Sequence, residues 1–334
     1  MYLRTLMWEW GRRMNFRSLC VALALGVAAS PIHAADYPER AVRFVIEFPA
    51  GGAVDVVARR IAAKLTERFG QQFIVDNRAG AGGVIAHEFV AKARPDGYTV
   101  LLATTPFAAN AALYKKLPYD AAADFTPVSF IADWAALYVV HPSVPARTFP
   151  EFVRLAKSRP GQLTYSSAGV GSFVHLAPEM LFNRAGIKLT HVPYKGAAPA
   201  LTDVIAGFID AKLDSYVTSI PHMKTGRLRA LGVSSAERMV QLPEIPTIAE
   251  QGYPGYAAAI WLGLVVPKGT PSDIVTRLES AFITAVKDRD VSARLIDDGI
   301  RPVGGTAADL DALIRKERAQ WSKLVRDIGL KPTQ

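Results

Sequence analysis

The apolar positions of this chain alternate between two spacings. Short runs rich in β-branched and aromatic residues, typical of buried strands, occupy residues 43–48, 72–75 and 98–103. Glycine-containing turns follow, and apolar residues then recur every three or four positions, as at residues 53–69 and 84–93, which indicates helices. This order predicts parallel strand–helix–strand units with right-handed crossovers.

Residues 130–140 and 256–266 are two apolar stretches of similar length, with a second alternation of strands and helices between them. We interpret them as paired strands that cross between two domains, since about 300 residues suffice for two domains. Domain 1 is then discontinuous, formed by residues 35–137 and 261–334, and domain 2 spans residues 138–260. The alternative is that both stretches are ordinary core strands of one large sheet.

Residues 1–34 have the pattern of a secretory signal peptide. Four arginines precede or flank an apolar segment from Leu19 to Ala29, and a small-residue end closes at Ala34. The apolar segment is shorter than the ~20 residues that a membrane-spanning helix needs. Met14 is an alternative start, because it would leave an n-region of ordinary length. We therefore expect export to the periplasm.

Removal of this segment changes the charge and the cysteine content. It takes away four arginines and one glutamate, so the formal net charge falls from +9 to +6, and it removes Cys20, the only cysteine. A mature chain without disulfides is compatible with an oxidising compartment. The remaining positive charge is spread along the chain without a run of five basic residues, which indicates a solvated surface and no nucleic-acid partner.

Sequence signatures of catalysis and of metal binding are missing. The histidines form no His-Glu-x-x-His pair, and no cysteine ligand remains after processing. Gly169-Val170-Gly171-Ser172 does not have the Gly-x-Ser-x-Gly order of a nucleophile elbow, and there is no phosphate loop that ends in Gly-Lys-Ser or Gly-Lys-Thr. We expect no catalytic residue, no metal and no cofactor.

Glycine turns before helices recur instead. They lie at residues 51–52, 80–83 and 169–172, each after a predicted strand. A helix that opens on glycine exposes its first N–H groups and the positive end of its dipole to small anions. Ligands of open parallel sheets lie beyond the carboxyl ends of the strands. The turns therefore predict a cleft that binds phosphate or carboxylate.

Several motifs, in order along the mature chain, resemble the Bug family, the periplasmic substrate-binding proteins of tripartite tricarboxylate transporters (TTT). They are Tyr37-Pro38, Phe48-Pro49-Ala50-Gly51-Gly52-x-x-Asp55-x-x-Ala58-Arg59, Asn77-Arg78-Ala79-Gly80-Ala81-Gly82-Gly83, Pro95-Asp96-Gly97-Tyr98-Thr99, Val192-Pro193-Tyr194-Lys195-Gly196 and Pro243-Glu244-Ile245-Pro246-Thr247.

This resemblance implies an α/β, two-domain periplasmic-binding-protein (Venus flytrap) fold, with each domain a mostly parallel sheet flanked by helices. It implies an extracytoplasmic solute receptor that is not an enzyme. Such a receptor binds a small carboxylate in the interdomain cleft through backbone amides and delivers it to a membrane permease of one large and one small subunit. We expect a monomer. Two alternatives remain: a periplasmic ligand sensor that feeds a signalling partner, and an enzyme of similar fold that acts on a carboxylate.

The resemblance also implies which residues contact the ligand and which support the loops around it. Asp55, Asn77 and Gly80 are expected to support the loops, because a carboxylate such as Asp55 would repel an anionic ligand. Arg78 and Lys195 could be counter-ions, but amide-based binding favours structural or surface roles for them. The expected ligand-binding residues are Ala50, Gly51, Gly52, Thr104, Thr105, Ser167, Gly169, Gly171, Ser172 and Asp214.

Overall fold

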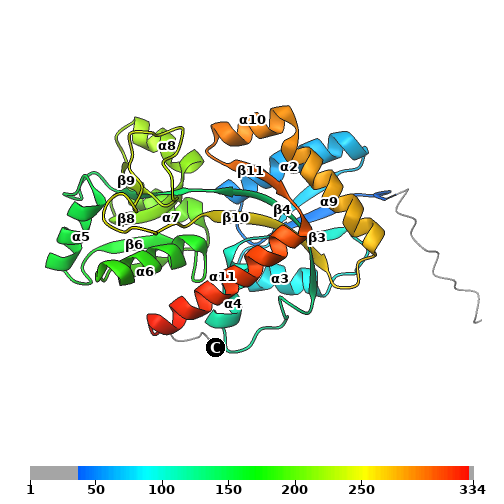
Figure 1. Cartoon of the computed structure of the whole chain (residues 1–334), viewed down its shortest axis with the longest axis horizontal. Coiled ribbons are helices and arrows are strands. Elements are labelled where there is room, and N and C mark those ends of the chain that lie inside the picture. Colours follow the sequence, from blue (N-terminus) through cyan, green and yellow to red (C-terminus); the bar gives the residue numbers. More distant parts are fainter. Residues whose placement is uncertain (1–36, 331–334) are drawn as a thin grey trace, which may run out of the picture. The chain divides into compact units, whose positions relative to one another are not determined.

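Two β-sheets organise residues 37–330, the part of the chain that the computed structural model describes (Figure 1). The expected signal peptide at residues 1–34 lies outside these described residues. No helix in the described part is long and apolar enough to cross a membrane.

The first sheet has six strands in the order β11-β4-β10-β3-β1-β2. The strands predicted from the three N-terminal apolar runs are β1, β2 and β3, and β1 pairs in parallel with both of the others. The six strands of the first sheet are β1 (Val42–Ile46), β2 (Phe73–Asn77), β3 (Thr99–Ala103), β4 (Phe125–Trp134), β10 (Ile260–Pro267) and β11 (Arg301–Gly305).

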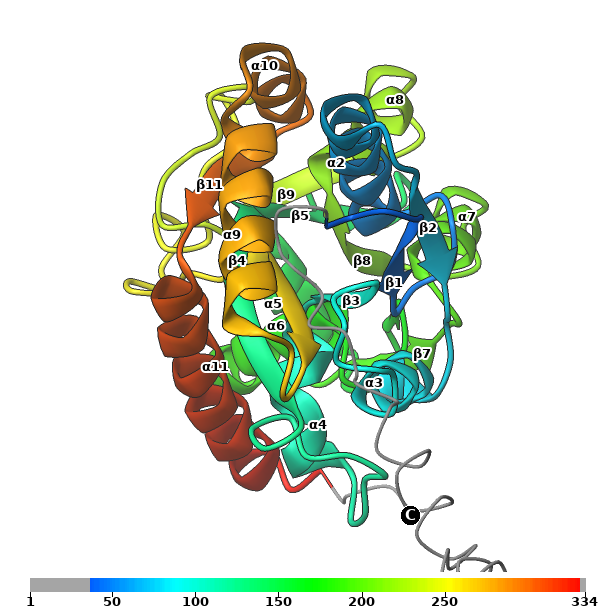
Figure 2. The ribbon, with the colours of Figure 1, turned by 90° about the vertical axis from the view of Figure 1, so that its right-hand side faces the viewer.

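Helices cover both faces of the first sheet (Figures 1 and 2). The helices α2, α9 and α10 contact one another on one face, while α11 packs against α4 on the other. These helices, with one 3-10 turn, are α2 (Ala53–Phe69), η1 (Ala81–Gly83), α3 (Val84–Ala91), α4 (Thr105–Leu113), α9 (Ser272–Lys287), α10 (Arg289–Asp297) and α11 (Ala307–Asp327).

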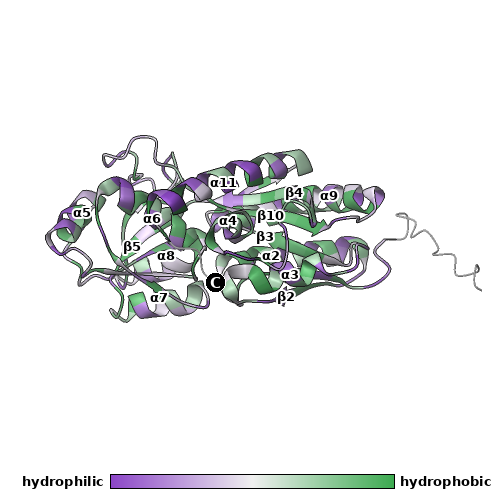
Figure 3. Cartoon of the chain, turned by 90° about the horizontal axis from the view of Figure 1, so that it is seen from below, coloured by the Kyte–Doolittle hydropathy of each residue, from purple (hydrophilic) through white to green (hydrophobic). Residues whose placement is uncertain are grey.

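The alternation of side chains along β1 explains how both faces are filled. Phe44 stacks on Phe282 of α9, with ring centroids 5.1 Å apart. Its neighbour Val45 belongs to the opposite core cluster, which includes Val90 and Leu310. Successive strand residues point to opposite faces, so a strand buried on both sides is apolar throughout. Figure 3 shows hydrophobic colouring on β3, β4 and β10 and hydrophilic stripes on α9 and α11.

The second sheet has five strands in the order β7-β6-β8-β5-β9. Its strands are β5 (Ala136–Val140), β6 (Thr164–Ser167), β7 (Thr190–Pro193), β8 (Ala211–Ser215) and β9 (Arg229–Val233). Its helices are α5 (Phe149–Ser158), α6 (Phe173–Ala185), α7 (Ala197–Ile205) and α8 (Tyr216–Lys224).

Both sheets are mixed, whereas the sequence predicted mostly parallel ones. The pairs β10–β3, β10–β4 and β11–β4 are antiparallel in the first sheet, as are β5–β8 and β5–β9 in the second. The reason is the route of the chain. It leaves the first sheet along β4 and returns along β10, so the two crossing strands lie side by side and run in opposite directions, with Trp134 opposite Ile260.

All strands of the second sheet lie between β4 and β10 in the sequence. The first sheet is therefore built from two separate parts of the chain, as a discontinuous first domain would be. We propose domain boundaries near residues 137 and 260.

Candidate functional site

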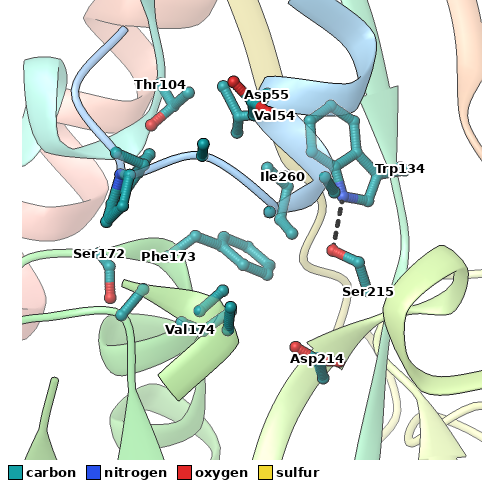
Figure 4. Close-up of a pocket in the computed structure, with 18 of the residues that line it drawn as sticks. Val54, Asp55, Thr104, Trp134, Ser172, Phe173, Val174, Asp214, Ser215 and Ile260 are labelled. Carbon is teal, nitrogen blue, oxygen red and sulfur yellow. Dashed lines mark hydrogen bonds between the residues drawn. The ribbon is translucent and has the colours of Figure 1, made fainter. Parts of the chain in front are cut away.

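A pocket lies where elements of the two sheets meet, at strand carboxyl ends (Figure 4). Its cavity volume is about 70 Å³. First-sheet elements supply Phe48, Pro49, Ala50, Gly52, Ala53, Val54, Asp55, Thr104, Trp134 and Ile260, and second-sheet elements supply Ala168, Ser172, Phe173, Val174, Ala197, Ala198, Pro199, Asp214 and Ser215.

Five helices begin at this pocket, and none of them is capped by a side chain. Their N-cap residues are Gly52, Thr104, Ser172, Gly196 and Ser215, for α2, α4, α6, α7 and α8. The helices α5, α10 and α11 do have capping side chains on their first turns. The first amides of a helix have no carbonyl partner within it, and they carry the positive end of its dipole. The pocket thus gathers amide donors suited to an anion.

The first glycine turn is held by Asp55. Its Oδ2 accepts from the Gly51 amide at 3.2 Å, its Oδ1 accepts from Asn77 Nδ2 at 3.0 Å, and Arg59 bonds to both oxygens. Burial acts to raise the pKa of Asp55, but the bonds from Arg59, Asn77 and Gly51 outweigh it and lower that pKa below its usual value. Gly51 has φ +91°, which favours glycine. Both oxygens of the Asp55 carboxylate are therefore hydrogen-bonded within the protein, where they hold the loop.

Two stacked histidines form hydrogen bonds with the glycine turn that follows β6. His175 and His191 have ring centroids 4.1 Å apart. His191 Nε2 is 2.7 Å from the Ser167 hydroxyl, and His175 Nδ1 accepts from the Gly171 amide at 3.2 Å. Burial lowers the pKa of both rings, to about 3 for His175, where the neighbouring ring also contributes, and to about 4 for His191. Both rings are neutral near pH 7.

This pair predicts a loss of stability on acidification. In the unfolded chain a histidine takes up its proton near pH ~6.5, whereas in the folded chain His175 and His191 do so only near pH 3 and 4. The stabilisation is complete above the unfolded value and is lost as the pH falls from there toward the folded values. Each ring contributes at most ~1.4 kcal/mol per pH unit within that window.

Urea unfolding at several pH values measures this slope. We expect His191→Gln to reduce the slope between pH 6 and pH 4.5 by up to about 1.4 kcal/mol per pH unit relative to the unaltered chain. The difference between the two proteins at pH 8 is the control, since it reports lost packing alone. A variant with an unaltered slope would contradict the assignment.

Asp214 lines the pocket, but its carboxylate is already bonded. Oδ1 contacts the buried Lys212 ammonium, and Oδ2 accepts from Thr218 at 2.7 Å and Ser219 at 2.8 Å. At this side of the pocket the Ser215 hydroxyl accepts from Trp134 Nε1 at 3.1 Å (Figure 4).

The predicted site residues fall into two groups. Ala50, Gly52, Thr104, Ser172 and Asp214 line the pocket, and Gly51, Thr105, Ser167, Gly169 and Gly171 are their neighbours in the same loops without being part of its lining.

The possible counter-ions Arg78 and Lys195 and the glycine turn at residues 80–83 are not part of the pocket lining. Arg78 is paired with Asp76 and lies over the Phe89 ring, 3.5 Å from its centroid, and Lys195 is exposed. Gly80 has φ +133° in the turn before η1, where glycine is favoured. Among the described residues that line the pocket there is no lysine, arginine or histidine.

Sequence reasoning missed two features. One is the apolar wall formed by Trp134, Phe173, Val174 and Ile260. The other is the buried Glu47, which contacts Thr104 and His87. A lone acid directly after the apolar run of β1 was a usable signal, because a buried charged group needs partners. The described residues hold no cluster of three or more His, Cys, Asp or Glu side chains suited to a metal.

Comparisons with known proteins agree with this architecture. The TctC family, described as tripartite tricarboxylate transporter family receptor, matches residues 57–330. A relative from Pseudomonas sp. strain P51, the UPF0065 protein in the tcbD-tcbE intergenic region, is 40% identical over 316 residues, or 94% of each chain.

Two solved structures are similar over their whole length. R. palustris Rpa4515 with adipate aligns with a TM-score of 0.86 and 38% identity over 89% of this chain and 100% of that one. The periplasmic binding protein BugD aligns with a TM-score of 0.84 and 31% identity over 89% of this chain and 100% of its own. These similarities confirm the predicted two-domain α/β fold.

Proposed function

Because this chain belongs to the tripartite tricarboxylate transporter receptor family, we propose that its pocket binds a small carboxylate and that the protein delivers this ligand to a two-subunit membrane permease. The family consists of receptors rather than enzymes. The adipate bound to the similar Rpa4515 supports a carboxylate as the ligand class.

The uncapped helix N-termini at the pocket carry this proposal. Amides of α2 from the first sheet and of α6 and α7 from the second border the same space. Hydrogen bonds to a charged group contribute ~1.5–3 kcal/mol each, so several amides suffice for micromolar affinity after the cost of association. A carboxylate bound this way needs no cationic side chain.

The position of the pocket supports closure around the ligand. Its lining comes from both sheets, and Trp134 and Ile260 lie at the point where the crossing strands leave the first sheet. We propose that the two domains, divided near residues 137 and 260, move about this crossing. We also propose that the protein is exported to the periplasm and that it is a monomer.

Isothermal titration of the mature protein tests the ligand class. A panel of monocarboxylates, dicarboxylates and tricarboxylates should contain at least one ligand with a dissociation constant of about 1 μM or lower. Inorganic phosphate is the control anion and should bind at least a hundredfold more weakly. Flat traces for every carboxylate would contradict the proposed function.

A further inference from the structure

The glycine turn at residues 80–83 does not line the pocket, but it contacts the half of the pocket that the second-sheet elements form. Gly82 lies in η1, on the side of the first sheet, and Val170 lies in the loop between β6 and α6. A Cβ atom built on Gly82 would be 2.9 Å from the Val170 carbonyl oxygen, closer than real Cβ atoms come to another heavy atom. The two backbones therefore meet here only because Gly82 has no side chain.

Two further contacts of the same kind join the halves of the pocket. A Cβ atom built on Gly171, in the second-sheet half, would be 2.7 Å from Leu113 Cδ1 of α4, in the first-sheet half. A Cβ atom built on Gly196, before α7, would be 2.6 Å from Cγ and 2.9 Å from Cδ of Pro49, which follows β1. At each of the three contacts, a glycine of one half meets an atom of the other.

The backbone at Gly196 shows why glycine is needed at this position. Gly82 and Gly171 have φ +58° and +83°, so their own turns favour glycine. Gly196 has φ 165° and ψ 172°, an extended conformation that any residue adopts. The three atoms nearest to its built Cβ all belong to Pro49, whose ring is fixed to the backbone and cannot rotate away. The opposite half of the pocket, rather than the local fold, therefore excludes a side chain at Gly196.

These contacts set the distance between amide donors from the two sheets. Gly196 is the N-cap of α7, and Gly171 directly precedes Ser172, the N-cap of α6. Ser172 and Thr104, the N-cap of α4, lie on opposite sides of the pocket (Figure 4). Hydrogen bonds weaken steeply when donor and acceptor move apart. A side chain that held the halves apart would leave one set of amides out of reach of a ligand bound to the other.

Building on the proposed function, we propose that Gly196 and the third glycine turn are positioning residues for ligand binding. They contact the opposite half of the pocket rather than the ligand, and they let the α7 and α6 amides approach those of α2 and α4. Gly196 must lack a side chain because Pro49 occupies the space that its Cβ would take.

A designed disulfide tests the contact between Gly196 and Pro49. The Cβ atom built on Gly196 is 3.7 Å from Pro49 Cβ, within the range of about 3.5–4.5 Å that a disulfide requires. The only cysteine of the chain, Cys20, lies in the expected signal peptide. The mature variant Pro49→Cys with Gly196→Cys should therefore form one intramolecular disulfide under mild oxidation. Mass spectrometry after alkylation measures its rate, and the two single-cysteine variants are the controls.

Adipate, succinate and citrate are the probe ligands. A saturating concentration of the probe that binds most tightly should accelerate disulfide formation at least about tenfold, because bound ligand favours the state in which the halves meet. No disulfide with or without the probe would overturn the contact, and equal rates would overturn its link to binding. Both results leave the proposed function intact. No binding of any carboxylate to the unaltered protein would remove the proposed function and the positioning role together.

A double-mutant cycle assigns the role to this pair of residues. Gly196→Ala should reduce the affinity for the probe about tenfold or more, mainly through faster dissociation, because the clash arises only when the halves meet. Pro49→Ala removes Cγ and Cδ, so in that background Gly196→Ala should cost less than about threefold. Calorimetry and stopped-flow binding measure both effects, and thermal unfolding verifies the fold. Equal losses in the two backgrounds would overturn the role of Gly196 as a positioning residue.

Discussion

Gly52→Glu is expected to reduce ligand affinity at least a hundredfold while the protein stays folded. Gly52 is the N-cap of α2, with φ −89° and ψ 168°, a conformation open to any residue. A Cβ built there meets only the Ala197 Cβ, at the ordinary distance of 3.9 Å. The longer side chain extends into the pocket, and its carboxylate occupies the positive helix end that the ligand needs. Calorimetry with the ligand of the unaltered protein measures the loss.

Two further substitutions of Gly52 separate the effect of side-chain volume on affinity from the effect of side-chain charge. Gly52→Ala adds only the Cβ and should keep affinity within a few fold. Gly52→Gln fills the pocket without a charge, so it should lie between the other two. Thermal unfolding of all three verifies the fold. If Gly52→Glu bound the ligand as tightly as Gly52→Ala, this turn would not be part of the binding site.

Lys212→Met is expected to destabilise the protein by about 3–5 kcal/mol, the cost of leaving a buried charge without its partner. Lys212 is 1% exposed on β8, between β6 and β5 in the second sheet. Its ammonium contacts the Asp214 carboxylate and donates to the Leu213 carbonyl at 3.2 Å. After the substitution, the Thr218 and Ser219 hydroxyls still donate to Asp214, but its charge has lost the Lys212 ammonium. Urea unfolding at pH 7 measures the free energy.

A second substitution and a surface pair provide the controls. Lys212→Met combined with Asp214→Asn removes the unpaired charge and should recover about 2 kcal/mol of the loss. Lys92 forms an exposed pair with Glu88 on the surface, and Lys92→Met should change the stability by less than about 0.5 kcal/mol. Equal effects of Lys212→Met and Lys92→Met would show that the buried pair contributes no more than a surface pair.

Local patterns in the sequence indicate the helices, the strands and two of the glycine turns that border the pocket. The apolar runs at β1, β2 and β3 and the helical spacing between them are local patterns, because side-chain periodicity follows from the geometry of each element. Gly51 and Gly169 mark turns with positive φ, a local requirement that glycine meets. These patterns predicted helices that open on glycine turns at strand ends. The turns at residues 51–52 and 169–172 border one pocket, whereas the turn at residues 80–83 is not part of its lining.

Packing between residues that are distant in sequence sets the direction of the hydrogen bonds at the pocket and forms its apolar wall. Thr104 and Asp214 read in sequence as polar groups available to a ligand, yet the Thr104 hydroxyl donates to Glu47, and one oxygen of the Asp214 carboxylate contacts Lys212. Glu47 and Thr104 are 57 residues apart, and Trp134 and Ile260 meet only through strand pairing. Periodicity is a property of neighbours along the chain, whereas a proton's direction depends on every partner that packing brings within hydrogen-bond distance. For this reason the glycine turns at the pocket could be predicted from the sequence, and the direction of its side-chain hydrogen bonds could not.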